Sequence, residues 1–155
     1  MPSAATKPGH WAASPSLTQT FNKILDNFSR VFTFTSTCVF LDEIGFLRVI
    51  AQRNHPYRDD LIGMRFPYAG NLLVKQLIQT GQPLRLADAQ QDPRFEKWAD
   101  AAHVRGWMAL PLVVAGRVIG LICVDSEQVN AYSEQDLHLA QAFADQAAVA
   151  VERPN

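Results

Sequence analysis

Two apolar runs of β-forming residues constrain the fold more than any other feature of the chain. They span residues 107–114 and 118–124 and are joined at Ala115 and Gly116. Because glycine accepts the positive φ that a tight turn needs, the pair is predicted to form a β-hairpin. Both runs are apolar on both faces, which does not suit a solvent-exposed edge. The hairpin is therefore expected at the centre of a sheet that is covered on both sides.

Helices are predicted at both ends of the chain. Near the N-terminus, Ser14 and Pro15 form a cap and first-turn pair. Near the C-terminus, residues 133–136 have the sequence Ser-Glu-Gln-Asp, which is typical of a capped helix start. The apolar residues that follow these two starts at helical spacing are Leu17, Phe21, Ile24, Leu25, Phe28 and Phe32, and then Leu137, Ala140, Ala144, Ala147 and Val151.

The middle of the chain alternates short elements. Residues 35–41 and 46–51 are β-rich and predict a second hairpin, turning at Gly45. Residues 53–67 lack periodicity and are predicted to be loop, with room for one short strand. Asn71 is the expected cap of a helix that ends at Gly81, and residues 84–86 follow as a strand. After Asp92 and Pro93 a short helix is predicted, with Phe95, Trp98, Ala99 and Ala102 on one face.

This order of elements predicts one domain of mixed helices and strands, α/β in the broad sense and α+β in the strict sense. An antiparallel sheet would carry the terminal helices on one face and the middle segments on the other. Residues 1–16 are rich in Ala, Ser and Pro and are expected to be a flexible leader, with the folded domain spanning residues 17–155.

The composition disfavours several classes of function. The 14 Lys and Arg nearly balance the 15 Asp and Glu, so there is no single-sign field to attract nucleic acid. No run reaches the roughly 18 apolar residues of a membrane span, and no secretory signal is visible. The domain is accordingly expected in the cytoplasm. Cys38 and Cys123 lie in strand-like runs, which favours buried thiols over a disulfide.

The run GWMALPLVVAGRVIGLICVD, residues 106–125, resembles the last hairpin of GAF domains. As in that family, it is followed by a helix that begins with Ser-Glu-Gln-Asp. The motifs at residues 80–84, 87–88 and 92–95 also match the middle of the family, so the resemblance covers roughly residues 17–152. It implies a sheet of five to six strands, similar to GAF and PAS domains, with a small-molecule pocket between the sheet and the middle segments.

The resemblance also implies a function. GAF domains occur in bacterial sensor histidine kinases of two-component systems, diguanylate cyclases, phosphodiesterases and transcriptional activators. Their terminal helices commonly form a dimer seam that carries the signal to an effector domain. In this chain the seam is expected to use Leu17, Phe21, Ile24, Phe28, Ala140, Ala144, Ala147 and Val151.

A cluster of aromatic residues before the central hairpin is the best candidate for a ligand pocket. Small-molecule pockets are lined by aromatic side chains with a few polar groups. The predicted ligand-binding residues are Phe40, Asp88, Asp92, Phe95, Trp98, His103 and Trp107. The alternative is that the aromatic residues are simply core, and that Asp92 caps the short helix.

The identity of any cofactor stays open. A bilin is disfavoured because no cysteine lies between Cys38 and Cys123, where the family would attach it. The same absence disfavours the free methionine sulfoxide reductase branch, which needs a thiolate there. His103 stands where some GAF sensors supply a haem ligand, but it also suits a helix cap. No metal-ligand spacing emerges among the histidines.

The leading interpretation is a regulatory domain, not an enzyme, that binds a small molecule of unknown identity and relays the signal through a homodimer. One alternative is a ligand-free dimerisation module whose own side chains fill the pocket. A haem- or metal-binding sensor that uses His103 is a further alternative. A thiol enzyme would require Cys38 or Cys123 to be accessible, against their positions in strands.

Overall fold

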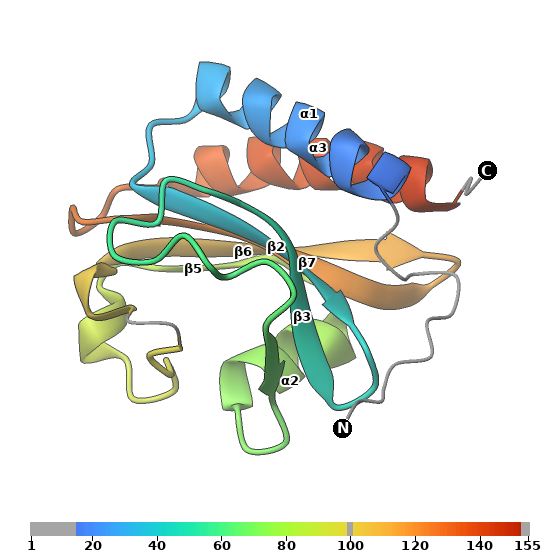
Figure 1. The fold of residues 1–155 in the computed structure, drawn as a ribbon. Helices are drawn as coiled ribbons and strands as arrows, with labels where there is room; N and C mark the ends of the chain where they lie inside the picture. Colours follow the sequence, from blue (N-terminus) through green and yellow to red (C-terminus); the bar gives the residue numbers. More distant parts are fainter. Residues whose placement is uncertain (1–14, 99–100, 153–155) are drawn as a thin grey trace.

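The computed structural model describes residues 15–98 and 101–152, and it has a helical layer, a central sheet and a second layer of short segments (Figure 1). In chain order the elements are α1 (Pro15–Val31), β2 (Ser36–Asp42), β3 (Phe46–Arg53), β4 (Arg65–Pro67), α2 (Leu72–Thr80), β5 (Leu84–Leu86), the 3-10 turns η1 (Ala89–Gln91) and η2 (Ala101–His103), β6 (Gly106–Val114), β7 (Arg117–Ser126) and α3 (Glu134–Glu152). In the described part of the chain, none of these helices has the length and hydropathy that a membrane crossing needs.

The predicted central hairpin is confirmed. The six strands form one antiparallel sheet in the order β4-β3-β2-β7-β6-β5, which places β7 and β6 inside it. The turn between β6 and β7 has φ of 51° at Ala115 and 77° at Gly116, as a two-residue turn of the primed type requires. The second predicted hairpin, β2–β3, is present as well. The strands are apolar on both faces because both faces of the sheet are covered.

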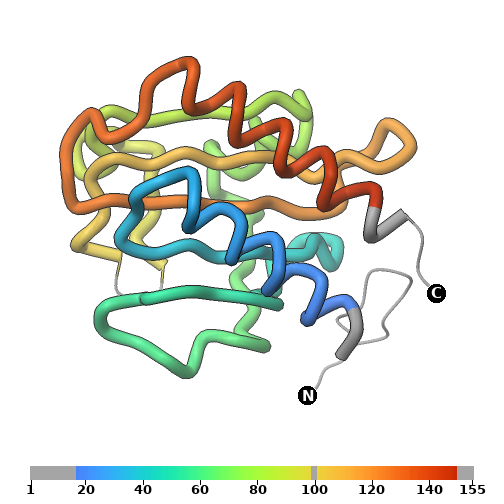
Figure 2. Tube along the Cα trace, turned by 90° about the horizontal axis from the view of Figure 1, so that it is seen from above, coloured from blue at the N-terminus to red at the C-terminus, as the bar shows by residue number. Residues whose placement is uncertain are grey.

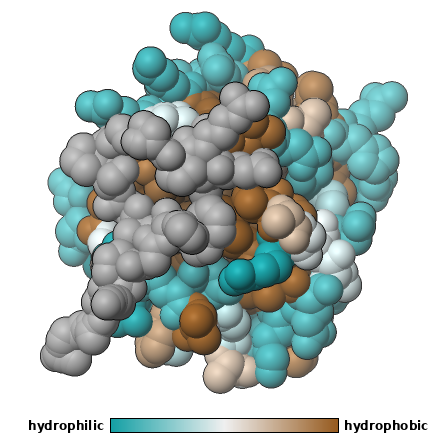
Figure 3. Space-filling model, turned by 90° about the vertical axis from the view of Figure 1, so that its right-hand side faces the viewer, coloured by the Kyte–Doolittle hydropathy of each residue, from teal (hydrophilic) through white to brown (hydrophobic). Residues whose placement is uncertain are grey.

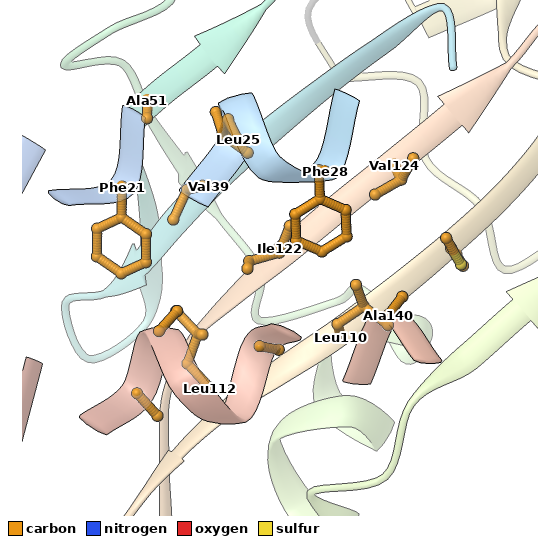
Figure 4. Close-up of a cluster of buried hydrophobic side chains, with 14 of the residues drawn as sticks. Phe21, Leu25, Phe28, Val39, Ala51, Leu110, Leu112, Ile122, Val124 and Ala140 are labelled. Atoms are coloured by element: carbon orange, nitrogen blue, oxygen red, sulfur yellow. The ribbon is translucent and has the colours of Figure 1, made fainter. Parts of the chain in front are cut away.

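Helices α1 and α3 lie side by side on one face of the sheet (Figures 1 and 2). Phe21, Leu25 and Phe28 of α1 are fully buried against strand residues such as Val39 and Ile122 (Figure 4). Alanines on the buried face of α3 let the helix approach β6 closely, because they add little bulk between backbone and sheet. The two terminal helices thus complete the main hydrophobic core.

The predicted starts of α2 and α3 and the predicted end of α2 are confirmed by their capping contacts, whereas the predicted cap Ser14 lies outside the described residues. The backbone N–H of Asp136 donates to the Ser133 hydroxyl at 3.0 Å, and the N–H of Ser133 donates back to the Asp136 carboxylate at 2.9 Å. The Asn71 side chain accepts from the N–H of Val74 at 3.0 Å, and Gly81 ends α2 with φ of 66°. These local signals were readable in the sequence because each involves only residues within one turn.

The prediction of a short helix after Pro93 is wrong for the residues that the structure describes. Residues 92–98 form turns and irregular backbone, and only the 3-10 turn η2 follows. One cause is local, because the Asp92 carboxylate accepts from the backbone N–H and the guanidinium of Arg94 instead of capping a helix. The other is that Phe95 and Trp98 pack against the distant rings of Trp107 and Phe66. Ala99, which was predicted on the same helix face, lies outside the described residues. Of the predicted leader, residues 1–14 also lie outside them, and residues 15 and 16 belong to α1.

The predicted dimer seam must also be corrected, because most of its residues lie in the domain's own core. A fully buried side chain cannot reach a second subunit without unfolding the first. Leu17 and Ile24 are half-buried and pack on the same core, and the Val151 side chain lies outside the described residues. The five seam residues with no exposed surface in the single chain are Phe21, Phe28, Ala140, Ala144 and Ala147.

A different stripe of α3 faces outward. Leu139 and Val149 each leave 48% of their surface exposed, and Ala142 is exposed on the same side of the helix. On the side of the molecule where α1 begins and α3 ends, hydrophobic side chains are visible among hydrophilic ones (Figure 3). We call Leu139, Ala142 and Val149 the outer stripe of α3.

Candidate ligand-binding cavity

A cavity of about 100 Å³ lies on the face of the sheet opposite α1 and α3. Its floor is formed by strands β2 and β7, which contribute three pairs of directly opposed residues. The cavity is far smaller than the roughly 300–1,000 Å³ of drug-sized pockets. The floor pairs are Ser36 with Asp125, Cys38 with Cys123, and Phe40 with Leu121.

One wall of the cavity is aromatic. The rings of Phe66 and Trp98 stack at a centroid distance of 4.9 Å with an interplanar angle of 9°. Phe40 meets Trp98 edge-on at 6.2 Å. Phe95 packs against Trp107 at 5.6 Å, also edge to face. Trp98 and Phe95 therefore pack against different rings. These contacts fix the position of the irregular segment that forms the wall, so no helix is needed there.

The other end of the cavity is polar and centres on Asp125. The Ser36 hydroxyl lies 2.9 and 2.7 Å from its two carboxylate oxygens, and His103 Nε2 lies 3.5 Å from Oδ1. The His103 side chain is only 3% exposed. Burial raises the pKa of the Asp125 carboxyl above its ordinary value, although the Ser36 hydrogen bond and the charge of His103 act in the opposite direction. The cavity thus encloses a carboxyl group that is held away from water.

His55 extends this polar end from a loop. Its Nδ1 accepts the backbone N–H groups of Tyr57 and Arg58, both at 3.1 Å. The His55 ring meets the His103 ring edge to face at 5.1 Å. Two imidazoles therefore stand together above the buried carboxyl.

Five of the seven residues predicted to bind a ligand line the cavity, and two do not. Asp88 caps the turn η1 and forms an ion pair with Arg105 at 2.8 Å. Asp92 pairs with Arg94 at 2.8 Å. Both carboxylates thus serve local structure. The five that the structure brings together are Phe40, Phe95, Trp98, His103 and Trp107.

Sequence reasoning missed the polar floor of the cavity. Cys123 and Asp125 alternate with core residues along β7, whereas Ser36, Thr37 and Cys38 follow one another at the start of β2. The alternation on β7 was the available signal, but only the register of the two strands shows that these residues meet. His55 was hidden because it lies in a loop without periodicity. Among the described residues, no group of three or more His, Cys, Asp or Glu side chains is placed to hold a metal ion.

The raised pKa of Asp125 predicts a pH dependence of stability. Because the folded protein holds this proton up to a higher pH than the unfolded chain, wild-type stability falls as the pH rises above about 3.8 through the folded pKa. Asp125→Asn removes this contribution. Its stability relative to wild type should therefore increase between pH 4 and pH 6 in urea unfolding curves.

The matched control is Asp59→Asn, at an exposed position. The change in relative stability with pH should be larger for Asp125→Asn than for this control over the same range. Equal changes for the two variants would show that the Asp125 carboxyl is not held in the way the structure indicates.

The family model of the GAF domain matches residues 16–151. The chain belongs to the GAF domain family. Members of this family act broadly as sensory or regulatory domains in signalling proteins. Among curated proteins, none matches this chain in sequence.

Solved structures confirm the GAF fold. A GAF domain/HD domain protein from Geobacter sulfurreducens has a TM-score of 0.77 at 14% identity, covering 87% of this chain and 91% of that one. A methyl-accepting chemotaxis protein, residues 122 to 287, has a TM-score of 0.77 at 19% identity, covering 90% of each chain. A type II free methionine-R-sulfoxide reductase from Thermoplasma acidophilum has a TM-score of 0.75 at 18% identity, covering 88% of this chain and 92% of that one. At these identities the likeness concerns the fold alone, and it includes both signalling proteins and an enzyme.

Proposed function

We propose that this GAF domain is a regulatory module that binds a small molecule in the cavity and changes the packing of its terminal helices in response. The observation that carries the proposal is the position of strands β2 and β7. Cys38 and Cys123 face the cavity, whereas their neighbours Val39 and Ile122 are buried under α1 and α3. A ligand that shifts the cavity floor therefore acts on strands against which the helices pack.

The cavity restricts the ligand to a small size. A cavity of about 150 Å³ is known to accommodate benzene, and this one measures about 100 Å³. The aromatic wall suits an apolar body, and Asp125 with the two imidazoles suits one polar group. We therefore expect a ligand of roughly the size of a single ring, with the polar group directed at the Asp125 end.

An enzymatic role through a thiol is less well supported. Burial raises the pKa of both Cys38 and Cys123, which disfavours the thiolate that nucleophilic catalysis needs. The domain would instead transmit its state to an attached effector such as a histidine kinase or diguanylate cyclase, as a homodimer. In that dimer the outer stripe of α3, with Leu139, Ala142 and Val149, would form the contact.

The binding proposal predicts that filling the cavity abolishes ligand binding. Ala101 lines the cavity, whereas the next residue, Ala102, is exposed and does not. Compounds of single-ring size should bind wild type and Ala102→Phe in saturation-transfer NMR, while Ala101→Phe should lose at least about tenfold in affinity because its ring occupies the space.

Thermal unfolding should show both variants folded. Equal affinity of Ala101→Phe and wild type for the bound compounds would place the binding elsewhere. If no compound binds wild type at all, the ligand-free dimerisation module becomes the better account.

A further inference from the structure

The two cysteines of the chain, far apart in sequence, face each other across the cavity floor. The register of β2 and β7 pairs Cys38 directly with Cys123. Directly opposed residues of an antiparallel pair place their side chains on the same face of the sheet. Both side chains line the cavity, and both are free thiols. The fold thus presents two thiols together at one place that a small molecule can occupy.

Their separation suits an atom that bonds both sulfurs. Opposed residues in an antiparallel pair have Cα atoms about 4.5 or 5.5 Å apart, depending on the hydrogen-bonding position. Both values lie within the range of about 4.4–6.8 Å over which a disulfide can form, so the two sulfurs can come close enough to bond a common atom. Bridging therefore requires rotation of the side chains but no rearrangement of the sheet.

The surroundings keep both sulfurs protonated. Burial raises the pKa of Cys38 to about 12, and it raises the pKa of Cys123 well above its ordinary value. The neighbouring Asp125 carboxyl acts in the same direction on both thiols. The cavity therefore favours a species that reacts with neutral thiols and leaves no net charge when it is bound.

We propose that Cys38 and Cys123 form a two-sulfur site for small trivalent arsenic hydroxides, with the aromatic wall beside them accepting an aryl substituent. In the reaction of R–As(OH)₂ with the two thiols, two As–S bonds form and two As–O bonds break. Each thiol proton leaves with one hydroxide as water, and arsenic stays trivalent. Neutral reactants give a neutral product and two water molecules. The inference rests on the cavity of the proposed function, but it concerns a covalent occupant.

Phenylarsine oxide, which hydrates to such a species, is the probe. With a phosphine reductant present to exclude disulfides, intact-mass analysis of the folded protein should show one phenylarsenic group per chain. A free-thiol assay should show that both thiols are lost together. Cys38→Ser and Cys123→Ser should each bind at least about tenfold more weakly, because a single As–S bond lacks the second anchor.

The double variant Cys123→Ser/Val124→Cys is the matched control. It keeps two thiols but moves the second to the opposite face of β7, where Val124 belongs to the core under the helices. It should bind as weakly as the single variants while remaining folded by circular dichroism. Binding equal to wild type in this variant, or capture of two arsenic groups by wild type, would overturn the inference.

Failure of this inference can be told apart from failure of the proposed function. The double variant Cys38→Ser/Cys123→Ser keeps the aromatic wall and Asp125. If the single-ring compounds bind it while wild type fails to retain phenylarsine oxide, only the dithiol site is overturned.

Discussion

Gly120→Ala is expected to destabilise the domain by about 3 kcal/mol or more. Gly120 lies on β7 opposite Leu41 of β2, in the middle of the sheet. A Cβ atom placed there would lie far inside van der Waals contact with the backbone carbonyl oxygen of Phe40. Since that obstacle is backbone and not a flexible side chain, the two strands would have to separate, and overpacking of this kind is not relieved by rotamer changes.

Thermal unfolding of Gly120→Ala checks this prediction. For a chain of this length, a loss of about 3 kcal/mol lowers Tm by roughly 6–12 °C. Gly70→Ala is the matched control, because a Cβ there meets nothing within 4 Å. It should leave Tm unchanged or slightly raised, since alanine reduces the entropy of the unfolded chain. Equal Tm values for the two variants would contradict the tight approach of β2 and β7.

Ala144→Glu should abolish folding at ambient temperature, whereas Ala142→Glu should leave the domain folded. Ala144 has no exposed surface and packs in the core between α3 and the sheet, so a glutamate there would bury an unpaired charge, at a cost of about 4 kcal/mol or more. Ala142 points outward on the same helix. Circular dichroism of the two variants reports the difference directly.

The same pair of variants tests the dimer proposal. If copies of the domain associate through the outer stripe of α3, Ala142→Glu should shift the sedimentation of a wild-type dimer toward the monomer. A folded Ala144→Glu that merely dissociates would instead support the inner-face seam that the sequence predicted, and it would contradict the burial seen here.

Local signals explain why much of the fold could be predicted from the sequence. The capping box at Ser133 and the glycine cap at Gly81 act within one turn, so their geometry is fixed by neighbouring residues. The central hairpin was readable from its continuous apolar runs. The segment after Pro93 was not, because Phe95 and Trp98 take their positions from distant rings, those of Trp107 and Phe66.

The candidate site was harder to predict than the fold. Phe40 and His103, which were predicted to bind a ligand, do line the cavity, but the Asp125 carboxyl and the cysteine pair come together only through strand register. The apolar stripes of the terminal helices could not be assigned from the sequence either to the core or to a dimer interface. A stripe such as that of Phe21 and Ala144 has the same spacing whether it covers a sheet or a second subunit, and only packing distinguishes the two.

Native mass spectrometry of freshly purified protein, combined with its absorption spectrum, tests most directly whether the cavity binds a small molecule. We predict a chain that carries a ligand of single-ring size, released on denaturation, with no visible absorption band of a haem or bilin. Ala101→Phe should be purified without that ligand, and Ala102→Phe should retain it. A wild-type protein that shows only the mass of its own chain, and that binds none of the single-ring compounds afterwards, would contradict the account.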